Sequence, residues 1–104
     1  MNLTGLNKRF DHEIREVVEY ENCYIVLLSV PFDENMVNNI FCLDDQLNIK
    51  WRAEDLDKKY PEKNNLPYEQ MTLGKGVIKA TDFYGRCYSL NVSNGKIIDM
   101  TIVK

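Results

Sequence analysis

The pattern of hydrophobic positions in the first third of the chain predicts two strands. Apolar residues stand at even spacing through residues 11–20, with Glu16 breaking the row, whereas Cys23–Val30 is apolar at nearly every position. Even spacing predicts a strand with one buried face, and a short apolar run predicts a strand buried on both faces. Glu21-Asn22 predicts the turn between them, and Pro31 ends the second strand because proline cannot donate to a central ladder.

Two short strands follow, Asn39–Leu43 and Asn48–Arg52, separated by a polar connection. Side chains alternate between the two faces of a strand. In the second of these strands we therefore expect Ile49 and Trp51 on one face and Lys50 and Arg52 on the other.

The last third of the chain predicts four more strands. Their expected ranges are Glu69–Leu73, Val77–Asp82, Arg86–Val92 and Lys96–Val103. Gly74-Lys75-Gly76 joins the first two as a tight hairpin connection. Asn94-Gly95 links the last two and is a strong signal for a short hairpin turn.

Two segments depart from the strand pattern. Ala53–Pro67 is irregular and predicts a loop, within which Asp55–Tyr60 has the character of a short helix. Near the N-terminus, apolar residues from Leu6 onward also satisfy helical spacing, so a helix running to Glu19 is the alternative to a strand from Asp11. We prefer the strand, because β-branched residues precede a turn that would close a hairpin.

The chain contains an internal repeat. Asn39–Asp44 resembles Arg86–Asn91, and Asn48–Trp51 then aligns with Lys96–Asp99 after a one-residue adjustment in the turn. The offset of about 47 residues lies near the length of a propeller-blade repeat, roughly 40–50 residues. The two repeat halves are about 11–53 and 68–104, within a single domain over residues 1–104.

The first copy of the repeat has an aromatic residue two positions before Leu-Asp, then a polar turn, and then Ile two positions before Trp. This pattern is similar to the outer hairpin of quinoprotein-type β-propeller blades. The residues that carry this resemblance are Phe41–Asp44, Asn48–Trp51, Gly85–Leu90 and Asn94–Ile97. The whole chain resembles small, uncharacterised bacterial proteins built from about two such blades. It departs from the blade pattern at Leu47, where glycine is usual, and at Asp99, where a second tryptophan is expected.

The expected fold is mainly β, with about eight antiparallel strands in two four-stranded, blade-like meanders packed together as an incomplete propeller or a sandwich. A short helix is expected near residues 55–60 or at the N-terminus. A propeller needs at least about four blades to close its ring, so a cofactor at a central channel is not implied. The two sheets would pack face to face, or a dimer would cover their open edges.

Composition and charge limit the partners and the cellular location that we expect for the protein. The chain is 44% hydrophobic and 28% charged, with a net charge of −3, and its basic residues are dispersed among acidic ones, which argues against nucleic-acid binding. The N-terminus lacks the apolar run of a secretion signal, and the longest apolar stretch is too short to span a bilayer. Three cysteines, Cys23, Cys42 and Cys87, fit reduced thiols in the cytoplasm rather than a disulfide framework.

The sequence contains few residues that could form a reactive site, and we predict no catalytic residue, cofactor or metal site. His12 is the sole histidine and is interpreted as a surface residue. The cysteines show no metal-binding or C-x-x-C spacing and are expected to pack in the core or at an edge. The turn at Gly74 lacks the phosphate-loop motif, and the acidic pairs Asp33-Glu34 and Asp44-Asp45 lack the other ligands of a calcium loop.

Aromatic residues are the main functional signal. Asp82–Gly85 places Phe83 and Tyr84 in a turn that cannot easily bury both rings. Since interface hot spots are enriched in Tyr, Trp and Arg, we expect an interaction surface near Trp51, Phe83, Tyr84 and Arg86, unless these rings simply cap the core.

The expected function is a non-enzymatic protein-interaction or regulatory module whose partner is another protein or a second copy of the chain. The alternative is a domain that binds a small ligand in a pocket between the two sheets. A third hypothesis is an enzyme that completes its site across a dimer.

Overall fold

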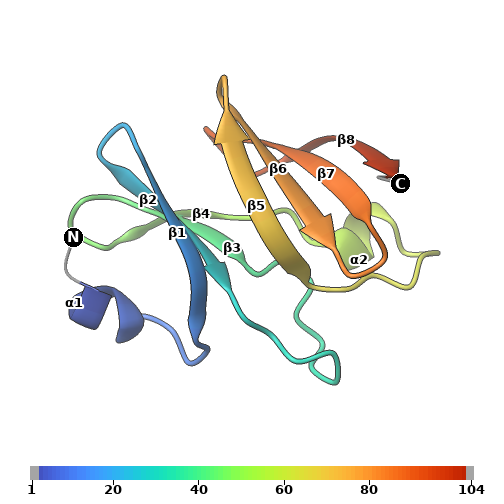
Figure 1. The fold of residues 1–104 in the computed structure, drawn as a ribbon, viewed down its shortest axis with the longest axis horizontal. Helices are drawn as coiled ribbons and strands as arrows, with labels where there is room; N and C mark the ends of the chain where they lie inside the picture. Colours follow the sequence, from blue (N-terminus) through green and yellow to red (C-terminus); the bar gives the residue numbers. More distant parts are fainter. Residues whose placement is uncertain (1–2, 103–104) are drawn as a thin grey trace.

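The computed structural model describes residues 3–102, which form two four-stranded antiparallel sheets and two short helices (Figure 1). The first sheet contains β1 (Ile14–Tyr20), β2 (Cys23–Leu28), β3 (Ile40–Leu43) and β4 (Ile49–Arg52). The second contains β5 (Tyr68–Gly74), β6 (Val77–Asp82), β7 (Arg86–Asn91) and β8 (Ile97–Ile102). In each sheet the strands pair in chain order, so the predicted pair of four-stranded meanders is confirmed.

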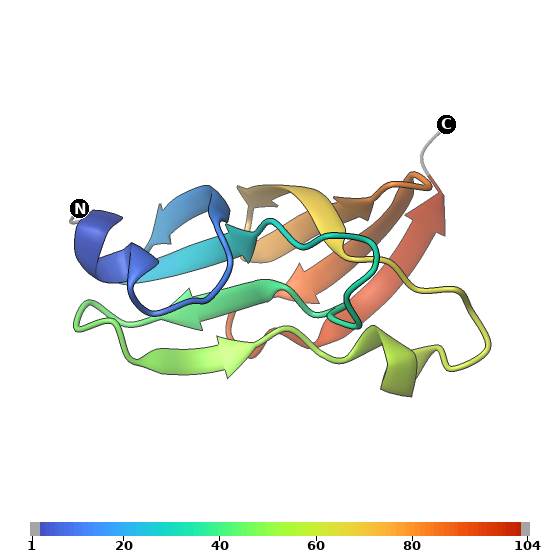
Figure 2. The same ribbon diagram turned by 90° about the horizontal axis from the view of Figure 1, so that it is seen from below.

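The two helices, α1 (Leu3–Asn7) and α2 (Leu56–Lys59), lie at opposite ends of the molecule (Figure 2). α2 is the short helix expected near residues 55–60, and its N-cap is Asp55, whose side chain accepts a hydrogen bond from a backbone N–H. The alternative of a helix running to Glu19 is wrong. β1 instead pairs along β2, which satisfies its backbone across the hairpin. Val103, the expected end of the last strand, lies outside the described residues.

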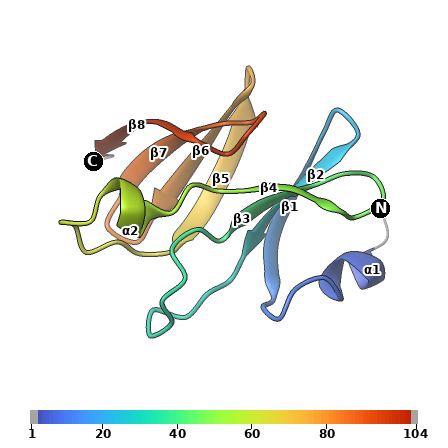
Figure 3. The same ribbon diagram turned by 180° about the vertical axis from the view of Figure 1, so that it is seen from behind.

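The two central strands of the first sheet, β2 and β3, are buried on both faces. Ile25 and Leu27 of β2 point into the core between the sheets, while Val26 and Leu28 belong to a second cluster on the opposite face. The α1 segment covers that second face through Leu6 and the chain that follows it, and α1 lies on the side of this sheet away from the second sheet (Figures 1 and 3). This double cover explains the uninterrupted apolar run in the sequence of β2.

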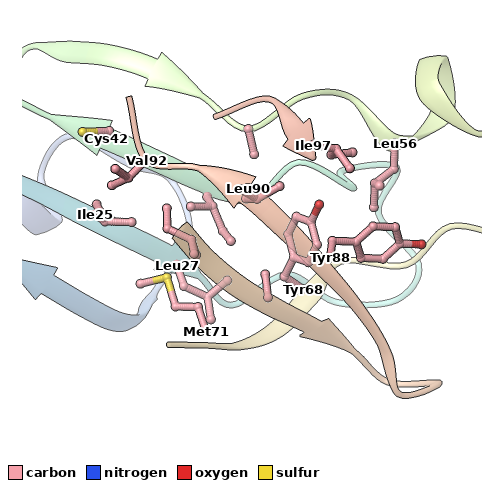
Figure 4. Packing of buried hydrophobic residues seen from close by; sticks show 14 of the residues in the cluster. Ile25, Leu27, Cys42, Leu56, Tyr68, Met71, Tyr88, Leu90, Val92 and Ile97 are labelled. Atoms are coloured by element: carbon pink, nitrogen blue, oxygen red, sulfur yellow. The ribbon is translucent and has the colours of Figure 1, made fainter. Parts of the chain in front are cut away.

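The second sheet has one buried face and one polar face. Alternate residues of β6 and β7 pack against the first sheet, with Tyr88 and Leu90 at the centre of the contact (Figure 4). On the other face Lys79 Nζ donates a hydrogen bond to Ser89 Oγ across 2.8 Å. The alternation of apolar and polar residues in this half of the sequence therefore reflects a sheet that is covered on one side only.

The two sheets repeat the same irregularities. Register shifts occur at the start of both first strands, between Ile14 and Glu16 and between Tyr68 and Gln70. Both third strands also shift before their last leucine, Leu43 or Leu90. The two sheets therefore share both their strand order and the positions of these bulges, which set the local twist of a strand.

The bulge in the β3–β4 hairpin overturns one expectation about side-chain facing. Ile49 pairs with Leu43 and Trp51 pairs with Cys42, and these two partners point to opposite faces of β3. Ile49 and Trp51 therefore do not share a face, because the extra residue between them, Lys50, interrupts the alternation. Trp51 packs against the core between the sheets, whereas Ile49 is 47% exposed.

Glu16, which breaks the hydrophobic row of β1, connects the two sheets. Its carboxylate accepts a hydrogen bond from the backbone N–H of Met71 in β5 at 3.0 Å. The neighbouring Arg15 donates to the Glu69 carbonyl oxygen at 3.1 Å. Polar side chains of one edge strand thus satisfy backbone groups of the other, which protects the edge of β5.

A buried amide also joins the two sheets. Asn39 is fully buried, and its Nδ2 donates to the carbonyl oxygens of Leu28 (2.7 Å) and Tyr68 (2.9 Å). Its Oδ1 accepts from the backbone N–H of Tyr68 at 2.9 Å. The side chain therefore supplies partners to backbone groups at the end of β2 and the start of β5, in a buried region where each such group needs a partner.

We expect Asn39→Ala to destabilise the domain by about 3 kcal/mol, because the substitution leaves buried backbone groups of both sheets without hydrogen-bond partners. Asn38→Ala is the matched control, since the adjacent side chain makes no hydrogen bond within the described residues and should cost under about 1 kcal/mol. Urea unfolding measures both. Equal losses in the two variants would contradict this role for Asn39.

Trp51 fixes the end of β4 against the β7–β8 turn. Its Nε1 donates to the Val92 carbonyl oxygen at 2.9 Å, and its ring lies against Gly95, which has a φ of +75°. The next segment of chain adds two more bonds, since Glu54 donates its N–H to the Gly95 carbonyl oxygen and its carboxylate accepts from Ile97 N. From β4 the chain continues past the second sheet to α2 (Figure 3).

Gly95→Ala should destabilise the domain by about 2 kcal/mol or more, because the new Cβ would collide with the Trp51 ring and would sit at a positive φ. Gly74→Ala is the control, since no heavy atom lies within 4 Å of its ideal Cβ. It should change the free energy of unfolding by less than about 0.5 kcal/mol. Thermal unfolding that shows similar losses for both variants would contradict the Trp51–Gly95 contact.

Candidate functional site

Three large aromatic side chains form an exposed cluster, which we call the aromatic patch: Phe32, Phe83 and Tyr84. Their side chains are 54%, 64% and 57% exposed. The ring centroids of Phe32 and Phe83 lie 5.4 Å apart and those of Phe83 and Tyr84 lie 6.2 Å apart, both with edge-to-face geometry. The rings thus form a continuous apolar surface rather than isolated exposed residues.

The patch is built by two connections that are far apart in sequence. Phe32 belongs to the loop between β2 and β3, and Phe83 and Tyr84 belong to the turn between β6 and β7. Both connections lie toward the lower right of the molecule in Figure 1. The turn closes through Gly85, whose φ of +82° is readily adopted only by glycine.

A buried carboxylate holds the β6–β7 turn. Asp82 is 4% exposed, and its Oδ1 accepts hydrogen bonds from the backbone N–H groups of Tyr84 (2.9 Å) and Arg86 (3.0 Å). Its Oδ2 accepts from Arg86 Nε at 2.7 Å. Because the carboxylate bonds both backbone and side chain, it fixes the conformation of the turn that presents the two rings.

Arg86 extends this network beneath the patch. Its Nη2 donates to the Asn64 carbonyl oxygen at 2.8 Å, which ties in the loop between α2 and β5. Its guanidinium carbon lies 5.1 Å from the centroid of the Tyr84 ring. The cation therefore supports the ring from below, and its charge is already paired with Asp82.

The loop that carries Phe32 is anchored at a second point. His12 Nε2 lies 2.9 Å from Oε1 of Glu34, so the segment before β1 holds the β2–β3 loop. Beside Phe32 lies a depression of about 270 Å³ whose lining includes Arg15 and Glu69, an ion pair at 3.4 Å. The apolar surface thus has a concave, charged border on one side.

The structure brings together most of the residues expected at an interaction surface. Phe83 and Tyr84 are exposed side by side, and Arg86 lies against Tyr84. Trp51 is not part of this surface, because it packs at the β7–β8 turn, at the other end of β7. Sequence reasoning missed Phe32, although a phenylalanine within a polar loop is a usable signal of exposure.

Asp44, which belongs to one of the two acidic pairs, has a structural role. Asp44 Oδ1 accepts the N–H groups of Gln46 and Asn48 at 2.9 Å each, which holds the turn and lowers the pKa of the Asp44 carboxyl.

Within residues 3–102, no group of three or more His, Cys, Asp and Glu residues is placed to hold a metal ion. No helix in the same part of the chain is long and apolar enough to cross a membrane.

Comparison with solved structures supports the fold. The chain is similar to a computationally designed protein, Ika8, with a TM-score of 0.60 and 7% sequence identity over 86% of this chain. The match covers 24% of the Ika8 chain, so this chain spans about a quarter of that length, and the likeness concerns the fold alone.

No curated protein matches the chain. One family profile matches residues 3–102 and carries the description "Domain of unknown function (DUF7957)". Because the match extends over nearly the whole sequence, the chain belongs to the DUF7957 family of domains.

Proposed function

We propose that this domain is a non-enzymatic protein-interaction module that binds another protein through the aromatic patch. The observation that carries the proposal is the contact of the exposed Phe83 ring with the exposed rings of Phe32 and Tyr84, from two separate connections. A partner that covers exposed rings removes their apolar surface from water. This burial contributes a favourable free energy of roughly 25 cal/mol per Å² of apolar surface. A cluster of this kind supports partner binding more strongly than singly exposed residues do.

The rigidity of the patch supports the same proposal. The Asp82–Arg86 ion pair and the two turn hydrogen bonds hold Tyr84 in place before any partner arrives. The loop that carries Phe32 is held by the His12–Glu34 contact. A surface that is ordered in advance loses little conformational entropy on binding, which raises affinity for a given contact area.

The border of the patch indicates the chemistry of the partner. Apolar side chains of the partner would cover the rings of Phe32 and Phe83, since aliphatic and aromatic groups match them. The depression with Arg15 and Glu69 would receive a polar or charged group at the rim. This combination of an apolar centre and a polar rim is the usual composition of a protein–protein interface.

We also infer that the two sheets are propeller-blade-type repeats and that the domain works in the cytoplasm. The matched bulges of the two sheets support the first inference, together with Trp51 and Asp99, which pair with the equivalent Cys42 and Ser89. The three free cysteines support the second, because a reducing compartment keeps thiols unpaired.

Changing Phe83 and Tyr84 together to serine should abolish partner binding while leaving the fold intact. Both side chains are exposed, so we expect a loss of no more than about 1 kcal/mol in the free energy of unfolding, from the lost ring contacts. Binding is measured by crosslinking the domain in native cell extract and quantifying each captured protein by mass spectrometry.

The matched control changes Ile49 and Ile98 to serine, since these are also large exposed hydrophobic residues but lie outside the patch. A protein captured by the wild-type and control domains and lost with the patch variant supports the proposal. Equal capture by all three domains would refute it, as would collapse of the fold in the patch variant. If the captured protein is a second copy of the domain, light scattering will show a dimer that the patch variant loses.

A further inference from the structure

Two of the three cysteines meet at the rim between the sheets. Cys42 of β3 pairs with Ile25 of β2, so Cys23 stands diagonally across from Cys42 on the inner face of the first sheet. Both cysteines line the same small pocket. Cys42 is buried, whereas Cys23 is partly exposed.

Lys50 completes the cluster. It is the extra residue of the β4 bulge, and its ammonium nitrogen lies 3.4 Å from Cys23 Sγ. The three side chains line a pocket of about 140 Å³ that is closed on the second-sheet side by Val92 and Ser93. The pocket gives a small molecule access to a cysteine that is already in contact with a cation.

The surroundings give the two sulfurs different roles. Burial, followed by the electrostatic interaction with the neighbouring Cys23, raises the pKa of the Cys42 thiol to about 11. Cys42 therefore keeps its proton at neutral pH. Contact with Cys23 also raises the pKa of Lys50, which keeps its ammonium charged. Tyr20, Glu21 and Asp44 are the other titratable groups around the cluster.

We propose that Cys23 and Cys42 are a redox-active thiol pair that a small-molecule disulfide oxidises stoichiometrically. Cys23 is the attacking sulfur because it is partly exposed and its sulfur accepts a hydrogen bond from the Lys50 ammonium. Cys42 is the resolving sulfur because it is buried directly beside it. This proposal concerns a different surface from the aromatic patch and does not depend on it.

The reaction proceeds by two exchanges. The Cys23 thiolate attacks one sulfur of the small-molecule disulfide, and the other sulfur leaves as a thiolate that takes up a proton from solvent. Cys42 then gives up its proton and attacks the Cys23 sulfur of the mixed disulfide, which releases the second small-molecule sulfur as a thiol. Two protein thiols are oxidised to one disulfide, and one small-molecule disulfide is reduced to two thiols.

The diagonal placement predicts that the internal disulfide is easily reversed. Diagonal neighbours on paired strands lie roughly 7–8 Å apart, whereas the Cα atoms of a relaxed disulfide are about 4.4–6.8 Å apart. Closing the bond must therefore pull the two strands together. A disulfide under strain is more readily reduced than a relaxed structural one.

Oxidised glutathione is the probe for this proposal, with peptide mapping by mass spectrometry as the readout. In the wild-type domain we expect a Cys23–Cys42 disulfide, and in Cys42→Ala a stable glutathione adduct on Cys23. Cys87 is the internal control, because it is also partly exposed but its neighbour Lys79 donates to Ser89 instead. It should react at least tenfold more slowly than Cys23.

Lys50→Met should slow the first exchange at Cys23 roughly five- to tenfold through loss of the nearby charge, while Lys50→Arg keeps most of the rate. Neither change should affect Cys87, and Lys50 is exposed, so both variants are expected to fold. In urea the difference between Cys23 and Cys87 should disappear. Equal rates at Cys23 and Cys87 in the folded domain, no effect of Lys50→Met, or no Cys23–Cys42 disulfide at complete oxidation would each overturn the proposal.

Discussion

The hydrogen bonds of one buried amide define how the two sheets of this domain meet. Asn39 bonds to backbone groups of Leu28 and Tyr68, so the end of β2 and the start of β5 have a fixed separation and orientation. The apolar core supplies the larger favourable energy, but hydrophobic contact is not directional. A satisfied polar group inside that core adds geometric specificity, because any other arrangement would leave its partners unbonded.

Both candidate sites follow from this arrangement of the sheets. The central strands of the first sheet are covered on both of their faces and the second sheet on one, so the aromatic patch and the thiol cluster lie at connections and rims. At one end, the loops beside β2 and β6 place Phe32 against Phe83. At the rim of the core, the bulge of β4 directs Lys50 to Cys23 instead of leaving it on the outer face. Sheet packing thus creates the aromatic patch, strand register brings the two thiols together, and a local irregularity adds Lys50 to them.

Much of the fold could be read from the order of apolar and polar residues. The strands fell within a few residues of their expected ranges, because backbone pairing in a meander is local and turn residues such as those at Gly95 mark its limits. The aromatic turn at Phe83 was also predictable, since it presents two large rings between polar neighbours. Glu16, in contrast, looked like a break in β1, and only its bond to Met71 of the other sheet explains it.

The sequence alone determined the number and order of the strands, their meander pairing, and the burial of the second strand on both of its faces. These properties depend on residues close together along the chain. Tertiary structure decided the position of the bulge that separates Ile49 from Trp51, the contact between Phe32 and Phe83, and the meeting of Cys23, Cys42 and Lys50. Each of these depends on strand register or on sheet packing, where a shift of one residue reverses the facing of every side chain.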